Sequence, residues 1–270
     1  MSIKKVDCAT LSKWVDSLIG RQRVIGVQAQ ADRFVFAELR KAANLRLDYD
    51  ITILPPKEFL QPPCERLLTF KEDEGYTSVE EVVPTILLGV HPYDVAAIKQ
   101  MDELFEQDHC DTRYMKRRAA TTIVAVDVQN VSSNTFAGFM GTAHVDEGFD
   151  ILLTLTGEHY VADIRTDKGE AIVGMLKEAD DANEDLLKAR TFVWEKNEKL
   201  MKKHNLTVSP DKWPELLDKS YDNEIWDKRS EKCFSCGSCT LTCPTCYCFD
   251  VRENVDWSLK AGVRERVWDG

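Results

Sequence analysis

The sequence has no long apolar run and no apolar region behind its N-terminus. No stretch approaches the roughly 20 apolar residues that a bilayer-spanning helix requires. The charged opening residues are not followed by the apolar core of a secretory signal. These absences disfavour both a membrane span and secretion, so we expect a soluble, cytoplasmic protein without membrane contacts.

The sequence also lacks the common nucleotide-binding motifs and an excess of positive charge. It contains neither a Walker A motif nor a G-x-G-x-x-G fingerprint, so no signature favours directly bound ATP or NAD. Asp and Glu outnumber Lys and Arg, which gives a net charge of −11. Because binding to a phosphate backbone depends on Lys and Arg, we expect no nucleic-acid partner.

The first 180 residues have the pattern of an α/β domain with a mixed sheet. Leu11, Trp14, Val15 and Leu18 share one face of a predicted helix at 10–19. Apolar runs at 85–90 and 121–128 are typical of strands buried on both faces, and a helix at 94–106 lies between them. The other predicted strands, one of which alternates clearly, are 24–28, 45–54, 149–156 and 159–165.

A long charged helix separates this domain from the C-terminal segment. Residues 182–203 contain neither glycine nor proline, and apolar pairs recur every seven positions from Leu186-Leu187 onwards. Such a narrow stripe predicts a helix that packs along one seam. We therefore expect three parts, namely an α/β domain at 1–180, a helical linker region at 181–231 and a small cysteine-rich module at 232–270.

The nine cysteines are distributed unevenly. Cys8, Cys64 and Cys110 are isolated, as small hydrophobic residues of a core often are. The other six fall between positions 233 and 248. In a reducing compartment, a dense group of this kind more often binds metal than forms disulfides.

The first part of the group has the spacing of a bacterial ferredoxin. Cys233, Cys236, Cys239 and Cys243 follow the pattern C-x2-C-x2-C-x3-C-P. Structural zinc sites instead use Cys pairs separated by about a dozen or more residues, whereas here the pairs overlap. Thiolates are the soft ligands that iron–sulfur clusters need, and Gly237 permits a close approach of the loop backbone. We predict a ferredoxin-like iron–sulfur module.

The supply of cysteines limits the number of clusters. Six local thiols complete one [4Fe–4S] cluster, and two clusters with four thiolates each would exceed that supply. In an extended segment Cys246 and Cys248 would point to opposite sides of the chain, so that one would ligate while the other packs. The candidate ligands are Cys233, Cys236, Cys239 and Cys243, with Cys246 and Cys248 as alternatives to Cys243.

Several segments together carry a family resemblance. Residues 233–250 end in Cys-Pro-Thr-Cys-Tyr-Cys-Phe-Asp, and further motifs are Leu-Arg-Leu-Asp-Tyr-Asp at 45–50, Leu-Pro-Pro-Lys at 54–57, Gly-Val-His-Pro-Tyr-Asp at 89–94 and Met-Gly-Thr at 140–142. In these motifs and in their order, the sequence resembles the family that comprises the beta subunits of sulfhydrogenases and the corresponding iron–sulfur subunits of anaerobic sulfite reductases. The resemblance covers most of the chain.

The resemblance implies an iron–sulfur electron-transfer subunit of a soluble multi-subunit oxidoreductase. Such subunits exchange electrons with a flavin-containing, NAD(P)H-linked subunit and with a catalytic subunit of hydrogenase, sulfite reductase or heterodisulfide reductase type. They perform no substrate chemistry alone. The residues themselves leave an alternative, a cluster-containing enzyme that binds a small molecule near His91, because loops after parallel strands often line ligand pockets.

The chain departs from the family pattern in three places. The family often has Cys where this chain has Tyr93, and Cys-Phe-Cys in the stretch that here reads Phe-Ala-Gly-Phe-Met at 136–140. Any role of those upstream cysteines is lost here. The family also continues past a Trp like Trp268 to a second cysteine run, whereas this sequence stops at Gly270. We expect one [4Fe–4S] cluster, and a second only if residues outside this chain complete it.

Overall fold

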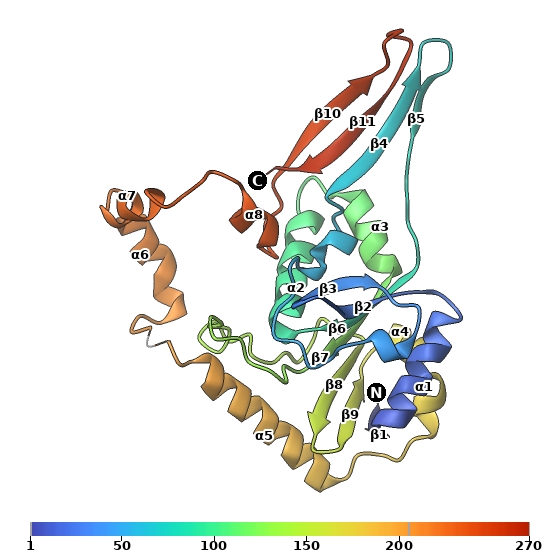
Figure 1. Ribbon diagram of the computed structural model, residues 1–270, viewed down its shortest axis with the longest axis vertical. Coiled ribbons are helices and arrows are strands. Elements are labelled where there is room, and N and C mark those ends of the chain that lie inside the picture. Colours follow the sequence, from blue (N-terminus) through green and yellow to red (C-terminus); the bar gives the residue numbers. More distant parts are fainter. Residues whose placement is uncertain (1, 205, 270) are drawn as a thin grey trace.

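The computed structural model describes residues 2–204 and 206–269. The largest sheet in this part of the chain has seven strands, of which the four central ones run parallel and the outer ones pair antiparallel (Figure 1). In spatial order they are β1 (Ser2–Asp7), β9 (His159–Ile164), β8 (Ile151–Thr156), β7 (Thr121–Val126), β6 (Thr85–Val90), β2 (Arg23–Gln30) and β3 (Arg33–Glu38). The predicted mixed sheet is confirmed.

The centre of this sheet is buried on both faces. Every residue of β6 is buried, as is nearly all of β7, and such continuously apolar strands need cover on both sides. The connections from β1 to β2 and from β6 to β7 run in opposite directions across the sheet. Right-handed crossovers therefore place α1 (Cys8–Ile19) on one face and α2 (Pro92–Glu106) with α3 (Thr112–Ala120) on the other.

The predicted helices of this domain are formed. The apolar face of α1, which includes Trp14 and Leu18, is buried against the sheet. Asp7 caps the N-terminus of α1 by accepting a hydrogen bond of 2.8 Å from the Thr10 N–H, which satisfies a donor that the helix leaves free. The predicted hairpin at 149–165 is the pair β8 and β9, followed by the short helices α4 (Asp167–Ile172) and η3 (Gly174–Glu178).

The strand predicted at 45–54 is wrong. Leu47 and Tyr49 are buried, as the alternation requires, but Ile51 and Ile53 are about half exposed. After the short helix η1 (Ala42–Asn44), the segment crosses the ends of β2 and β3 and makes one isolated backbone hydrogen bond to each. Because no strand lies in register beside it, the two-residue alternation here reflects side-chain burial in a loop.

Helix α5 (Glu184–Met201) is the predicted long helix, and it lies against β8 and β9. Met201 is buried, and the pairs Leu186-Leu187 and Val193-Trp194 are partly buried, which confirms packing along a narrow stripe. None of the described helices combines the length and the apolar character needed to cross a bilayer.

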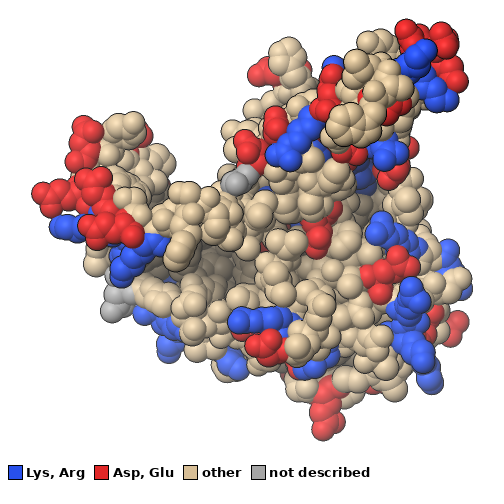
Figure 2. All heavy atoms as spheres, turned by 45° about the horizontal axis from the view of Figure 1, so that its top comes forward, with Lys and Arg blue, Asp and Glu red and all other residues tan. Residues whose placement is uncertain are grey.

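Beyond α5 the chain forms an arm (residues 210–230) that stands away from the rest of the molecule (Figure 1). Its helices are η4 (Pro210–Lys212), α6 (Trp213–Lys219) and α7 (Ile225–Ser230), and none of their described residues is buried. The Trp213 ring stacks on Phe139 with 6.3 Å between ring centres, which fixes the start of the arm. Figure 2 shows that the surface is hollowed between the arm and the body.

The C-terminal strands form a second sheet with residues from the first third of the chain. In the described residues its order is β10 (Phe249–Val255), β11 (Ala261–Trp268), β4 (Cys64–Lys71) and β5 (Gly75–Ser78), and all pairs are antiparallel. The two hairpins project together from the body (Figure 1). The pairing of β11 with β4 joins the predicted module at 232–270 to the predicted domain at 1–180, and the domain division itself stays a prediction.

A buried ion cluster, formed by Glu65, Asp111, Arg117 and Arg266, anchors this second sheet. Glu65 on β4 lies 2.6 Å from the guanidinium of Arg117 on α3 and 2.6 Å from that of Arg266 on β11. Asp111, which precedes α3, also pairs with Arg266. Because buried charges are tolerated only when paired, this cluster holds the C-terminal hairpin against the α/β domain.

Candidate metal centre

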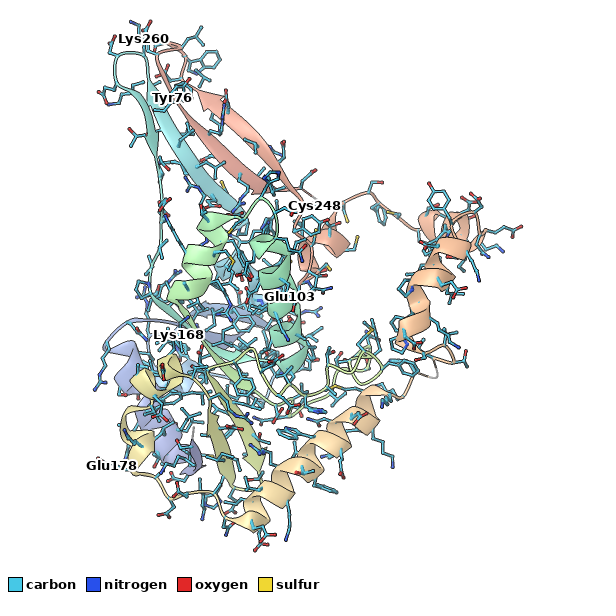
Figure 3. All side chains as sticks on the ribbon, turned by 180° about the vertical axis from the view of Figure 1, so that it is seen from behind. Tyr76, Glu103, Lys168, Glu178, Cys248 and Lys260 are labelled. Atoms are coloured by element: carbon cyan, nitrogen blue, oxygen red, sulfur yellow. The ribbon has the colours of Figure 1, made fainter. Side chains whose placement is uncertain are left out.

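The six clustered cysteines lie between the arm and β10, in a surface segment that includes the short helix α8 (Ser238–Thr242). All six are free thiols, four of them exposed, with Cys243 and Cys246 half-buried. Figure 3 labels Cys248, the last of them, at the base of the projecting hairpin. The segment therefore presents its thiols at the surface of the molecule.

Two residues with positive φ shape the first part of the segment. Ser235 has a φ of 52° and Gly237 one of 70°. Gly237 directly precedes α8, and its left-handed conformation, which side chains other than glycine resist, turns the chain into that helix. The same turn brings the Ser235 N–H to 3.4 Å from the Cys233 sulfur, and hydrogen bonds of this kind favour a thiolate.

Two further thiols lie in surroundings that favour their ionised form. The hydroxyl and backbone of Ser238 hydrogen-bond to Cys236 and lower the pKa of its thiol. Burial opposes ionisation of Cys243, but hydrogen bonds from Thr245 and the nearby Lys57 ammonium bring the pKa of the Cys243 thiol below its usual value. Because the thiolate is the metal-binding form, these contacts suit the predicted ligands.

Cys246 and Cys248 do not face opposite sides of the chain. The charge of the Cys246 thiolate and a hydrogen bond between the two thiols raise the pKa of Cys248, which requires the two sulfur atoms to be neighbours. The expectation from an extended strand was wrong because the segment turns before β10 begins. Either sulfur is therefore placed to face the same ligand.

Residues of the α/β domain support this end of the cysteine segment. Lys57, in the short helix η2 (Pro56–Phe59), is only 4% exposed, and its ammonium donates to the Cys246 carbonyl at 2.9 Å. The Gln61 amide donates to the Tyr247 carbonyl at 3.4 Å. Sequence reasoning used Leu-Pro-Pro-Lys only for a resemblance and assigned Lys57 no role, since no local pattern reveals a contact with residues so distant in the chain.

The surroundings of Lys57 suit a negatively charged group held by the cysteines. Burial lowers the pKa of Lys57, and the charges that oppose this effect are the thiols of Cys246, Cys243 and Cys248. A buried ammonium is destabilising unless it is paired, and thiolates around an iron–sulfur cluster would supply the counter-charge. Within residues 2–204 and 206–269, no three His, Cys, Asp or Glu side chains are gathered closely enough to hold a metal ion, so the ligand set stays a prediction.

Comparison with known proteins places the whole chain. Over 248 residues, which are 92% of this chain and 72% of the relative, it is 31% identical to sulfhydrogenase 2 subunit beta of Pyrococcus furiosus. The chain belongs to the sulfhydrogenase beta-subunit family. Residues 232–270 also match the family described as a 4Fe-4S dicluster domain. The predicted family and the predicted iron–sulfur chemistry are confirmed, and this member of the sulfhydrogenase beta-subunit family is an iron–sulfur electron-transfer protein.

The two upstream stretches where the sequence departs from the pattern of its sulfhydrogenase relatives lie together in space. Tyr93 packs against a small apolar cluster that contains Ala137 from the 136–140 stretch, together with Val128, Ala143 and Met201. These side chains make apolar contacts, so this region of the protein serves packing.

His91, the residue of the alternative hypothesis, is completely buried. Its ring stacks on Tyr49 with 3.9 Å between ring centres, and its Nδ1 lies 2.6 Å from the Tyr93 hydroxyl. Burial lowers the pKa of His91 to about 3, so the imidazole is neutral. Without exposed surface, His91 offers no free face to a ligand that enters from solvent.

Proposed function

We propose that this chain is the electron-relay subunit of a multi-subunit oxidoreductase. In this proposal the cluster passes electrons between a flavin-containing, NAD(P)H-linked subunit and a catalytic redox subunit of hydrogenase or reductase type. The ligands of one [4Fe–4S] cluster are Cys233, Cys236, Cys239 and Cys243, with Cys246 or Cys248 as the alternative fourth ligand. The observation that carries the proposal is the ferredoxin spacing of surface thiols inside a segment that matches a 4Fe-4S domain.

The bound cluster supplies a one-electron redox centre, and the chain's own residues hold and orient its thiolate ligands. Gly237 provides the left-handed turn, Ser238 stabilises the ionised form of Cys236, and Lys57 holds the far end of the segment. The four exposed cysteines stand at the surface, where a partner's redox centre can approach.

Exposed apolar side chains beside the cysteines support a role in a larger assembly. Phe234, within the motif, is 93% exposed. On the arm, the exposed apolar residues are Leu216, Leu217, Tyr221, Ile225 and Trp226. Apolar surface that its own chain leaves uncovered is typical of a contact site for another protein. The relative's name, a subunit of a sulfhydrogenase, agrees with such an assembly.

The test starts from protein purified anaerobically with its partner subunits. We expect about four iron and four sulfide per chain for one cluster, with broad visible absorption that dithionite bleaches. Cys236→Ser should lose NAD(P)H-dependent electron transfer to a viologen dye, since one ligand is gone, while its far-ultraviolet circular dichroism remains that of the wild type.

The matched control is Cys110→Ser, because Cys110 is an exposed free thiol outside the motif. That variant should keep both its iron and its electron transfer. Stoichiometric zinc without iron in the wild type would remove the central claim. Unchanged electron transfer in Cys236→Ser would exclude the relay through this cluster.

A further inference from the structure

Lys57 is a buried cation whose surroundings contain thiols. We propose that Lys57 fixes the Cys246–Cys248 segment and, as a constant positive charge, makes the bound cluster easier to reduce. The inference rests on the proposed function, because it requires a cluster held by Cys233 to Cys248. It adds a residue of the α/β domain, outside the cysteine segment, to the redox centre.

The position of the Lys57 ammonium is fixed from two sides. It donates to the Cys246 carbonyl at 2.9 Å, and it lies 4.4 Å from the centre of the Trp268 ring. That indole is itself held, because Trp268 Nε1 donates to the Gln61 carbonyl at 3.0 Å and the Trp268 N–H donates to the Pro63 carbonyl at 3.0 Å. With 4% of its surface exposed, Lys57 cannot swing out into solvent without breaking these contacts.

The electrostatic consequence follows from what faces this ammonium. Among the described residues, the charged groups that act on Lys57 are the thiols of Cys246, Cys243 and Cys248, with no carboxylate among them. Reduction adds one electron to a cluster that its thiolates already make negative, and a nearby positive charge stabilises that added charge. The effect is largest where water is excluded, because screening is weakest there. Net charge and hydrogen bonds around the sulfur atoms are known determinants of cluster potential.

The chain contains a matched control lysine far from the cysteines. Lys168 is also partly buried and donates to backbone carbonyls, those of Thr121 at 3.1 Å and Arg118 at 3.5 Å. Figure 3 labels Lys168 and Cys248 in well-separated parts of the molecule. Lys168→Met therefore removes a comparable side chain without changing the charge near the cysteine segment.

The experiment is a redox titration of the intact anaerobic protein, followed by visible absorption and electron paramagnetic resonance. In Lys57→Met, the ratio of reduced to oxidised cluster at the wild-type midpoint should fall about tenfold, a shift of about 59 mV to lower potential for a one-electron couple. Lys57→Arg keeps the charge and should remain near the wild-type midpoint. Lys168→Met should not shift it.

Each outcome separates the inference from the function on which it rests. A wild type without iron and sulfide would refute the proposed function. A normal wild-type cluster with an unchanged midpoint in Lys57→Met would overturn the role of Lys57 alone. If Lys57→Met binds no iron, Lys57→Gln and Lys57→Arg decide: retention of iron by arginine only supports the charge, and loss of iron in both overturns it.

Discussion

Glu65→Gln perturbs the buried ion cluster without changing the size of the side chain. The Glu65 carboxylate is 8% exposed and pairs with both Arg117 and Arg266, so its neutralisation leaves two buried guanidinium groups without that counter-charge. Removing one partner of a buried ion pair destabilises proteins by about 3 to 5 kcal/mol. Because Asp111 still pairs with Arg266, we expect a value near the lower end, about 3 kcal/mol.

The assay is equilibrium urea unfolding of the anaerobic protein, in which the free energy of unfolding is obtained from the midpoint and slope. Glu253→Gln is the matched control, because the Glu253–Arg264 pair lies on the same C-terminal hairpin but is exposed. An exposed pair contributes less than about 1 kcal/mol, so the control should unfold almost as the wild type does. A Glu65→Gln variant as stable as this control would refute the reasoning that the ion cluster anchors the hairpin.

Two other residues of the α/β domain give independent tests. Burial raises the pKa of Asp94 to about 7, so its stabilising contribution is present below about pH 4 and is lost as the pH rises through about 7. Asp94→Asn should flatten this fall in unfolding free energy, which is at most about 4 kcal/mol for three pKa units, and an unchanged pH slope would contradict the assignment. The buried Tyr49 hydroxyl donates to the Gly89 carbonyl at 2.7 Å. Tyr49→Phe should therefore lower the unfolding free energy by about 1 to 2 kcal/mol, and an unshifted urea midpoint would show that the bond adds nothing.

The elements that could be predicted from the sequence are those whose signal is local. The buried strands at 85–90 and 121–128 are apolar without interruption, and the face of the helix at 10–19 repeats with helical period. The segment 45–54 alternates as a strand does, yet it is a loop, because a strand also needs a neighbour and only β2 and β3 could have supplied one. The pairing of β11 with β4 joins positions about 200 residues apart, and no pattern within either strand specifies its partner.

The candidate site divides in the same way. The ferredoxin run was readable because four ligands within a few turns of chain need a fixed local spacing. The closeness of Cys246 to Cys248 was not, because it depends on the turn before β10. Lys57 was equally hidden, since its contact with the Cys246 carbonyl spans 189 positions in the chain.

The long-range pairing of β4 with β11 also bears on how the protein is made. On the ribosome, β4 emerges early and can pair with β5, but its other edge has no partner until residues 261–268 are synthesised. An unpaired strand edge is a site of aggregation, so the nascent chain carries this hazard through most of its synthesis. Trp268, which packs on Lys57, also arrives only with β11. Maturation of the metal centre in its supported form is therefore a late, post-translational step.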